Sequence, residues 1–151
     1  MSSLDDLLGE RDLPTAEETL SFGEKIGRNL RGGEVILAYG SMGAGKTCLA
    51  QGVARGLGIK RVVNSPTFNM VKVYRGSSLT FYHVDAYRLE DASENRDIGL
   101  WDFLGDRDGV TYIEWPEYVL DDIQGVGECL RIDIRIRDDG SRSVEVKLEN
   151  V

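Results

Sequence analysis

The segment GSMGAGKT at residues 40–47 constrains this chain more than any other. It matches the pattern G-x-x-x-x-G-K-[ST], in which glycines let backbone N–H groups approach phosphate oxygens closely. An apolar run at residues 34–39 precedes the segment, and a helical pattern over residues 46–57 follows it. A helix N-terminus adds its positive dipole to the loop amides, so both favour an anion. The sequence therefore predicts a P-loop whose backbone holds phosphates between Gly43 and Thr47.

The P-loop pattern assigns chemistry to its last two residues. Lys46 is expected to reach the β and γ phosphates, and Thr47 is expected to offer its hydroxyl to Mg²⁺. Guanine-specific P-loop proteins usually carry an N-K-x-D segment, and this sequence has none. We therefore expect ATP rather than GTP.

Length, net charge and residue counts exclude several classes of protein for this chain. A chain of 151 residues fits one domain, and it is long enough to bury a core without disulfides. Its formal net charge of −8 argues against wrapping nucleic acid unaided, because duplex binding depends on Lys and Arg. Two cysteines and one histidine form neither a disulfide framework nor a zinc cluster. The N-terminus lacks a signal peptide and no apolar run is long enough to cross a membrane, so a cytoplasmic location is expected.

The periodicity of the remaining sequence predicts an α/β fold. Thr15 and Glu18 form a capping box that starts a helix. Strict alternation of apolar and charged residues marks strands, and turn segments join two pairs of them into hairpins. We expect helices over 15–33, 46–57 and 90–104, and strands over 34–39, 69–74, 79–85, 109–115, 129–137 and 143–148. The prediction is a single P-loop domain over 14–151, with a mixed, mostly parallel sheet flanked by helices, after a loosely ordered lead-in over 1–13.

Two carboxylates compete for the metal role that a P-loop ATPase requires at a strand end. Asp85 closes the segment LTFYHVD, and Glu114 closes VTYIE. Spacing alone does not rank them. Thr67, in the segment SPTF, fits a loop that senses a γ phosphate, although Pro66 explains the same loop as a simple turn.

Several other residues allow a plain structural reading. His83 alternates within a strand, so a structural role is the simplest account of it. Trp115 suits the core or a pocket wall, and Cys48 suits burial on the P-loop helix. Arg88 and Arg142 are candidates for stabilising a transferring phosphate, although most arginines lie on the surface.

Four segments together resemble the bacterial TsaE (YjeE) family. They are GSMGAGKT at 40–47, SPTF at 65–68, YHVDAYRL at 82–89 and IEWPE at 113–117, in the order and near the spacing of that family. The P-loop is common to many families, whereas YHVDAYRL combined with IEWPE is much more specific. The resemblance implies a small P-loop ATPase of α/β fold that works with TsaB and TsaD homologues. Those proteins make threonylcarbamoyladenosine in tRNA, so contact with tRNA is expected only through the complex.

The resemblance also implies roles for single residues. Thr47 and Glu114 would hold Mg²⁺, with Glu114 as the direct ligand. Asp85 would lie near Mg²⁺ and the γ phosphate and orient the attacking water, and Thr67 would lie in a switch-like loop. The residues implied to contact the nucleotide are Met42, Gly43, Ala44, Gly45, Lys46, Thr47, Cys48, Trp115 and Arg142.

The chain departs from the family at Ser41 and Met42, where the usual loop has an acid followed by leucine. This change removes a negative charge near the phosphates and leaves the Gly, Lys and Thr roles intact. Because no arginine is clearly placed to stabilise the transition state, slow hydrolysis with stimulation by a partner is expected. Two alternatives stay open: a small-molecule P-loop kinase and a non-catalytic switch that only senses nucleotide.

Overall fold

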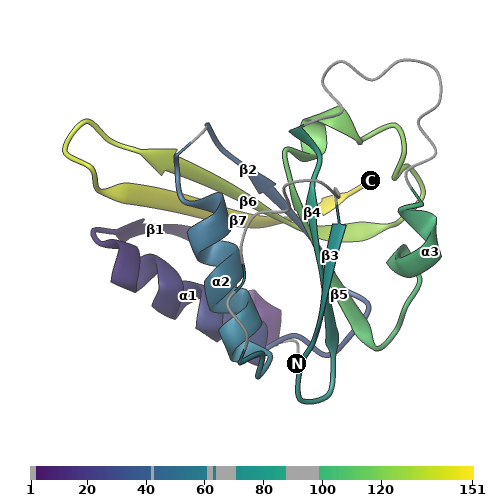
Figure 1. The fold of residues 1–151 in the computed structure, drawn as a ribbon. Coiled ribbons are helices and arrows are strands. Elements are labelled where there is room, and N and C mark those ends of the chain that lie inside the picture. The colour runs from purple at the N-terminus through teal and green to yellow at the C-terminus, as the bar shows by residue number, and fades with distance from the viewer. Residues whose placement is uncertain (1–2, 42, 61–62, 64–70, 88–98) are drawn as a thin grey trace.

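A seven-stranded sheet forms the centre of the computed structural model, which describes residues 3–41, 43–60, 63, 71–87 and 99–151 (Figure 1). The strand order is β1-β7-β6-β2-β5-β4-β3. The strands are β1 (Gly9–Leu13), β2 (Val35–Tyr39), β3 (Val71–Arg75), β4 (Thr80–Asp85), β5 (Gly109–Glu114), β6 (Glu128–Ile136) and β7 (Arg142–Asn150). The P-loop strand β2 therefore lies at the middle of the sheet.

The sheet is mixed and mostly parallel, as the sequence predicts. β2, β4, β5 and β6 pair in parallel, and β3 and β7 are antiparallel to their neighbours. β1 is antiparallel to β7, so it runs in the direction of the central strands. Five of the seven described strands thus share one direction. Parallel strands end at the same edge of the sheet, which brings the C-terminal ends of β2, β4 and β5 together.

Helices cover both faces of the sheet. α1 (Ala16–Arg28) and α2 (Lys46–Gly56) lie side by side on one face. The short helix α3 (Trp101–Leu104) lies on the other side, with the 3₁₀ helix η3 (Pro116–Tyr118) (Figure 1). Each face has its own buried apolar cluster, the larger one beneath α1 and α2. None of the helices in the described residues is long and apolar enough to span a membrane.

The backbones of α1 and α2 contact each other directly, with no side chain between them. We call this contact the glycine seam. The seam is formed by two pairs of glycines spaced four apart, Gly23 and Gly27 on α1 with Gly52 and Gly56 on α2. A Cβ atom added to Gly27 would lie 2.3 Å from the carbonyl oxygen of Val53. Residues four apart share one helix face, so each helix offers a flat strip to the other. The seam holds the P-loop helix at a fixed distance from α1.

Most of the predicted elements are confirmed. Thr15 caps α1 and accepts a hydrogen bond from the backbone N–H of Glu18 at 3.1 Å. α1 ends at Arg28, before the predicted exit at residues 32–33, because Asn29 closes the helix with bonds back to Gly27 and Ile26. The two predicted hairpins form as β3–β4 and β6–β7. Of the helix predicted over 90–104, residues 90–98 lie outside the described part and 101–104 form α3.

The loosely ordered lead-in is a wrong expectation for residues 3–13. Ser3–Leu7 form a 3₁₀ helix, η1, and β1 follows as an edge strand paired with β7 over its full length. Leu7 is fully buried and Leu13 nearly so. The segment gave no alternating pattern because an edge strand with one exposed face needs few apolar residues, and its partner is distant in sequence.

Candidate nucleotide-binding site

The P-loop runs from the end of β2 into the first turn of α2. Gly45 stands at the N-cap of α2 with φ +114° and ψ 15°, in the left-handed region that glycine adopts without strain. A Cβ atom at this position would also lie 2.8 Å from Nε of Arg142, so the loop passes that side chain closely. The N-terminal N–H groups of α2 lack helical acceptors and face the loop, which is the arrangement predicted for phosphate binding.

Lys46 lies folded back over its own loop. Its Nζ donates to the carbonyl oxygens of Gly40 and, at 3.2 Å, Ser41. The ammonium also lies 3.6 Å from the ring centroid of Trp115, in a cation–π contact. Burial lowers the pKa of Lys46, and the nearby Glu114 opposes that change. This enclosed cation is the natural counter-charge for a phosphate entering the loop.

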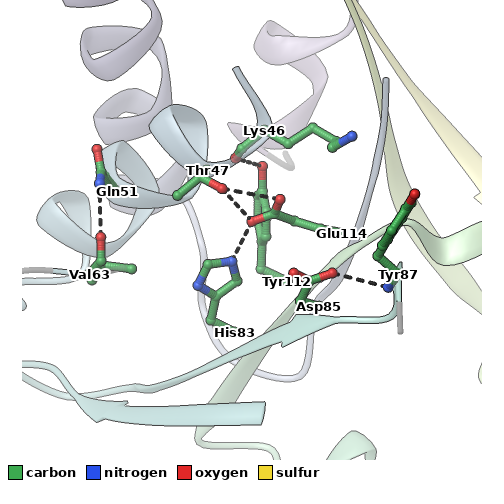
Figure 2. Close-up of polar contacts among 9 residues, drawn as sticks. All are labelled: Lys46, Thr47, Gln51, Val63, His83, Asp85, Tyr87, Tyr112 and Glu114. Atoms are coloured by element: carbon green, nitrogen blue, oxygen red, sulfur yellow. Dashed lines mark hydrogen bonds and ion pairs between the residues drawn. The ribbon is translucent and has the colours of Figure 1, made fainter. Parts of the chain in front are cut away.

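Thr47 and Glu114 are in direct contact across the site (Figure 2). The Thr47 hydroxyl donates to the Glu114 carboxylate, with Oγ1 lying 3.2 Å from Oε1 and 3.0 Å from Oε2. Glu114 ends β5 and is 4% exposed. The register of the sheet explains the contact, because Glu114 pairs with Ala38 of β2 just before the P-loop begins.

Asp85 lies beside Glu114 at the same end of the sheet. The two residues are paired in the parallel register of β4 and β5. One Asp85 oxygen, Oδ1, accepts a hydrogen bond from the backbone N–H of Tyr87 at 3.0 Å. The structure therefore places both candidate carboxylates at the same end of the sheet. Among the described residues, Glu114 is the carboxylate that accepts a hydrogen bond from Thr47.

A hollow of about 360 Å³ opens between these groups. It is lined by Gly43, Gly45, Lys46, Thr47, Cys48, Asp85, Glu114 and Trp115, all of them predicted site residues. Ala44 is fully buried behind the loop. Of the other candidates, Met42, Thr67 and Arg88 lie outside the described residues, and Arg142 lies against the loop.

The donor atoms in the hollow suit a hard cation. Thr47 supplies a hydroxyl, and Asp85 and Glu114 supply carboxylates. Within the described residues, no group of three or more His, Cys, Asp or Glu side chains forms a metal cage. Mg²⁺ is usually held by one or two carboxylates together with water and substrate phosphates, so a two-carboxylate site beside a P-loop fits it.

Arg142 contacts the P-loop from the start of β7. Its Nε donates to the carbonyl oxygen of Ala44 at 3.0 Å, and its side chain packs against Gly45. It is not part of the lining of the hollow. The structure therefore places this arginine against the P-loop through a backbone carbonyl, and its contact with the nucleotide stays a prediction.

Trp115 forms one wall of the hollow with an unusual backbone. Its φ of 60° and ψ of 50° place it in the left-handed region, which few non-glycine residues occupy. The ring lies 4.8 Å from that of Tyr87, measured between centroids, and Tyr118 completes an aromatic cluster. Pro116 follows and begins η3, so the turn after β5 aims the indole at Lys46.

Two further residues belong to the site: His83, for which the sequence favoured a structural role, and Tyr112, which the sequence did not single out. His83 is fully buried, and its Nε2 lies 2.6 Å from Oε2 of Glu114. Tyr112 is fully buried, and its hydroxyl donates to the backbone carbonyl of Lys46 at 2.6 Å (Figure 2). Both lie two residues before the strand-end carboxylates, and strand side chains alternate between faces. Residues two apart in a strand point to the same face of the sheet, so this spacing was the signal that could have placed both side chains beside the carboxylates.

Comparisons with known proteins find relatives over most of this chain. The family model described as "Threonylcarbamoyl adenosine biosynthesis protein TsaE" matches residues 13–144. A TsaE protein of Treponema pallidum is 39% identical over 132 residues, covering 87% of this chain and 95% of the relative. A TsaE protein of Bacillus subtilis is 38% identical over 128 residues, covering 85% and 78%.

A solved structure shows the same fold. The crystal structure of Bacillus subtilis YdiB superposes with a TM-score of 0.74 at 30% identity. The match covers 91% of this chain and 82% of the other. The family match and these relatives extend over most of the sequence, so the chain belongs to the TsaE family of tRNA threonylcarbamoyladenosine biosynthesis proteins.

Proposed function

We propose that this protein binds Mg–ATP in the P-loop hollow and hydrolyses it slowly, in support of threonylcarbamoyladenosine formation in tRNA. One observation carries the nucleotide part of the proposal: Lys46, Thr47, Asp85 and Glu114 converge on one hollow beside the N-terminus of α2. The relatives' printed names carry the pathway. A cytoplasmic location, with no role at a membrane, belongs to the same proposal.

Each side chain in the hollow has a distinct task in this scheme. The loop amides and Lys46 bind the phosphates, and Lys46 exchanges its contacts with Gly40 and Ser41 for phosphate oxygens. Thr47 and Glu114 would hold Mg²⁺, which would supply positive charge beside the β and γ phosphates. Asp85 borders the same hollow and would orient the attacking water.

We expect stimulation by a partner because the lining of the hollow has few positively charged side chains. Lys46 is the only Lys or Arg that lines it in the described part of the chain, and Arg142 approaches the loop through Ala44 instead. An additional arginine at the transferring phosphate is typically worth ~10³–10⁵ in rate. We therefore expect the isolated chain to be slow and a complex of TsaB and TsaD homologues to stimulate it, with tRNA reached through that complex.

The test combines binding and turnover. Calorimetric titration with ATP, with Mg²⁺ and with EDTA, should show binding that Mg²⁺ strengthens. Phosphate release should be slow for the isolated chain and faster with the TsaB–TsaD pair. Equal rates with and without the pair would contradict the partner role, and absence of nucleotide binding would contradict the whole proposal.

Asp85→Asn separates hydrolysis from sensing. If the protein is an ATPase, this variant should lose turnover and pathway support even at Mg²⁺ and ATP concentrations where Mg–ATP remains bound. If binding alone switches a partner, the variant should support the pathway as well as the native protein. ATP-dependent phosphorylation of a metabolite would instead indicate a kinase.

A further inference from the structure

His83 is fully enclosed, yet its ring is only half satisfied as a hydrogen-bonding group. Its Nε2 lies 2.6 Å from Oε2 of Glu114, and its Nδ1 has no hydrogen-bond partner among the residues that the structure describes. A carboxylate only accepts hydrogen bonds, so the nitrogen that faces it carries the proton. Within the described part of the chain, this buried imidazole therefore makes one hydrogen bond, from Nε2–H to Glu114.

The surroundings of the ring give no packing reason for an imidazole. Phe81 lies 6.0 Å away and Tyr112 lies 5.7 Å away, measured between ring centroids, with Tyr112 edge-on. An apolar ring of similar size would fill this aromatic environment without a buried, unpartnered acceptor. Such an acceptor costs about 1–3 kcal/mol. The polar function of His83 is thus directed at Glu114 and not at the core.

The two hydrogen bonds to Glu114 fix the rotation of its carboxylate. Thr47 approaches from α2 and His83 approaches from β4, on the neighbouring strand of the sheet (Figure 2). Oε2 accepts the shorter contacts, 2.6 Å from His83 and 3.0 Å from Thr47. Among the described residues, the one hydrogen bond to Oε1 is the longer contact of 3.2 Å from Thr47. Oε1 is therefore the oxygen better able to take a further partner from the hollow.

We infer that His83 is a positioning residue for the metal function of Glu114. Its Nε2–H holds Oε2 and thereby presents Oε1 to Mg²⁺ beside the hydroxyl of Thr47. The inference rests on the proposed Mg–ATP function and adds to it a residue that contacts neither metal nor nucleotide. A hydrogen-bond partner placed behind a metal ligand in this way typically changes metal affinity 10- to 100-fold.

Three substitutions separate the hydrogen bond from the volume of the ring. Gln places its side-chain amide nitrogen near the position of the imidazole Nε2, so His83→Gln keeps a donor to Glu114. Asn places its amide nitrogen near the position of Nδ1, so His83→Asn keeps polarity and loses that donor. His83→Phe keeps a ring and loses both nitrogens.

The measurement is Mg²⁺ affinity in the ternary complex with nucleotide, obtained by calorimetry or with Mn²⁺ as an EPR probe. His83→Phe and His83→Asn should weaken the metal affinity by roughly 10-fold or more. His83→Gln should restore most of it. With EDTA, nucleotide affinity should be the same in all variants, because Lys46 and the loop amides are untouched. Urea unfolding of each variant checks that the fold is intact.

The outcomes distinguish failure of this inference from failure of the proposed Mg–ATP function on which it rests. If wild-type nucleotide binding does not depend on Mg²⁺, the proposed function and the inference both fail. If wild type shows the dependence and folded His83→Phe keeps it unchanged, only the inference fails. A folded His83→Gln as weak as His83→Phe would also overturn it, since the amide donor would then not replace the imidazole.

Discussion

The glycine seam makes a sharp prediction for the stability of the protein. Gly27→Ala would place a Cβ atom 2.3 Å from the carbonyl oxygen of Val53 and 2.9 Å from the Cα of Gly56. Ordinary contacts of this kind begin at 3.4 Å, so the two helices must separate by about 1 Å. The neighbouring atoms are backbone, and no side chain can rotate to make room.

Two opposing terms set the size of the effect. Alanine is favoured over glycine inside a helix by about 1 kcal/mol. Overpacking a close contact costs about 1–3 kcal/mol, and the upper end applies where both neighbours are backbone. The net expectation is a loss of about 2 kcal/mol in the free energy of unfolding, equivalent to roughly 4–8 °C in Tm for a chain of this size.

The assay is urea unfolding followed by circular dichroism, with Gly105→Ala as the matched control. Gly105 has an ordinary φ of −91°, and a Cβ atom there would meet nothing within 4 Å. That control should stay within about 0.5 kcal/mol of wild type. A Gly27→Ala protein as stable as wild type, or about 1 kcal/mol more stable, would refute the reasoning, because helix propensity alone would then decide the result.

Three further predictions concern the hollow. Lys46→Ala should weaken ATP binding by roughly 10- to 100-fold, since a charge-assisted contact is lost; unchanged affinity in calorimetry would argue against the P-loop role. Glu114→Ala should raise the Mg²⁺ concentration needed for half-maximal hydrolysis, and a wild-type dependence would return the metal role to Asp85. At pH 8 a thiol reagent should label Cys48 faster than Cys129, because burial raises the pKa of both thiols, that of Cys129 to about 11, and Cys129 is the more buried of the two. Bound nucleotide should slow the labelling of Cys48, which lines the hollow; rapid reaction of Cys129 would contradict its burial.

The features that the sequence predicted well are those encoded locally. The P-loop is a contiguous motif, and Thr15 caps its helix three residues from its partner. Alternation in β6 and β7 marks a hairpin whose two strands are close in sequence. In each case the interacting groups lie near one another in the chain, so spacing alone identifies them.

The features that were missed depend on contacts between distant segments. β1 has no clear pattern of its own and becomes a strand by pairing with β7. The bond from His83 to Glu114 requires the register of β4 on β5, which no local pattern specifies. For the same reason spacing did not rank Asp85 against Glu114, whereas the sheet places only Glu114 in described contact with Thr47.

The pairing of β1 with β7 also bears on how the protein is made. β7 carries Arg142 against the P-loop and closes the sheet beside β6, and β1 completes that edge from the opposite end of the chain. β7 leaves the ribosome well after the P-loop, because 98 positions separate Ala44 from Arg142. Contacts between segments so far apart in sequence form slowly, because a large loop must close first. During synthesis the P-loop therefore lacks its Arg142 contact until β7 has been made and has paired in the sheet.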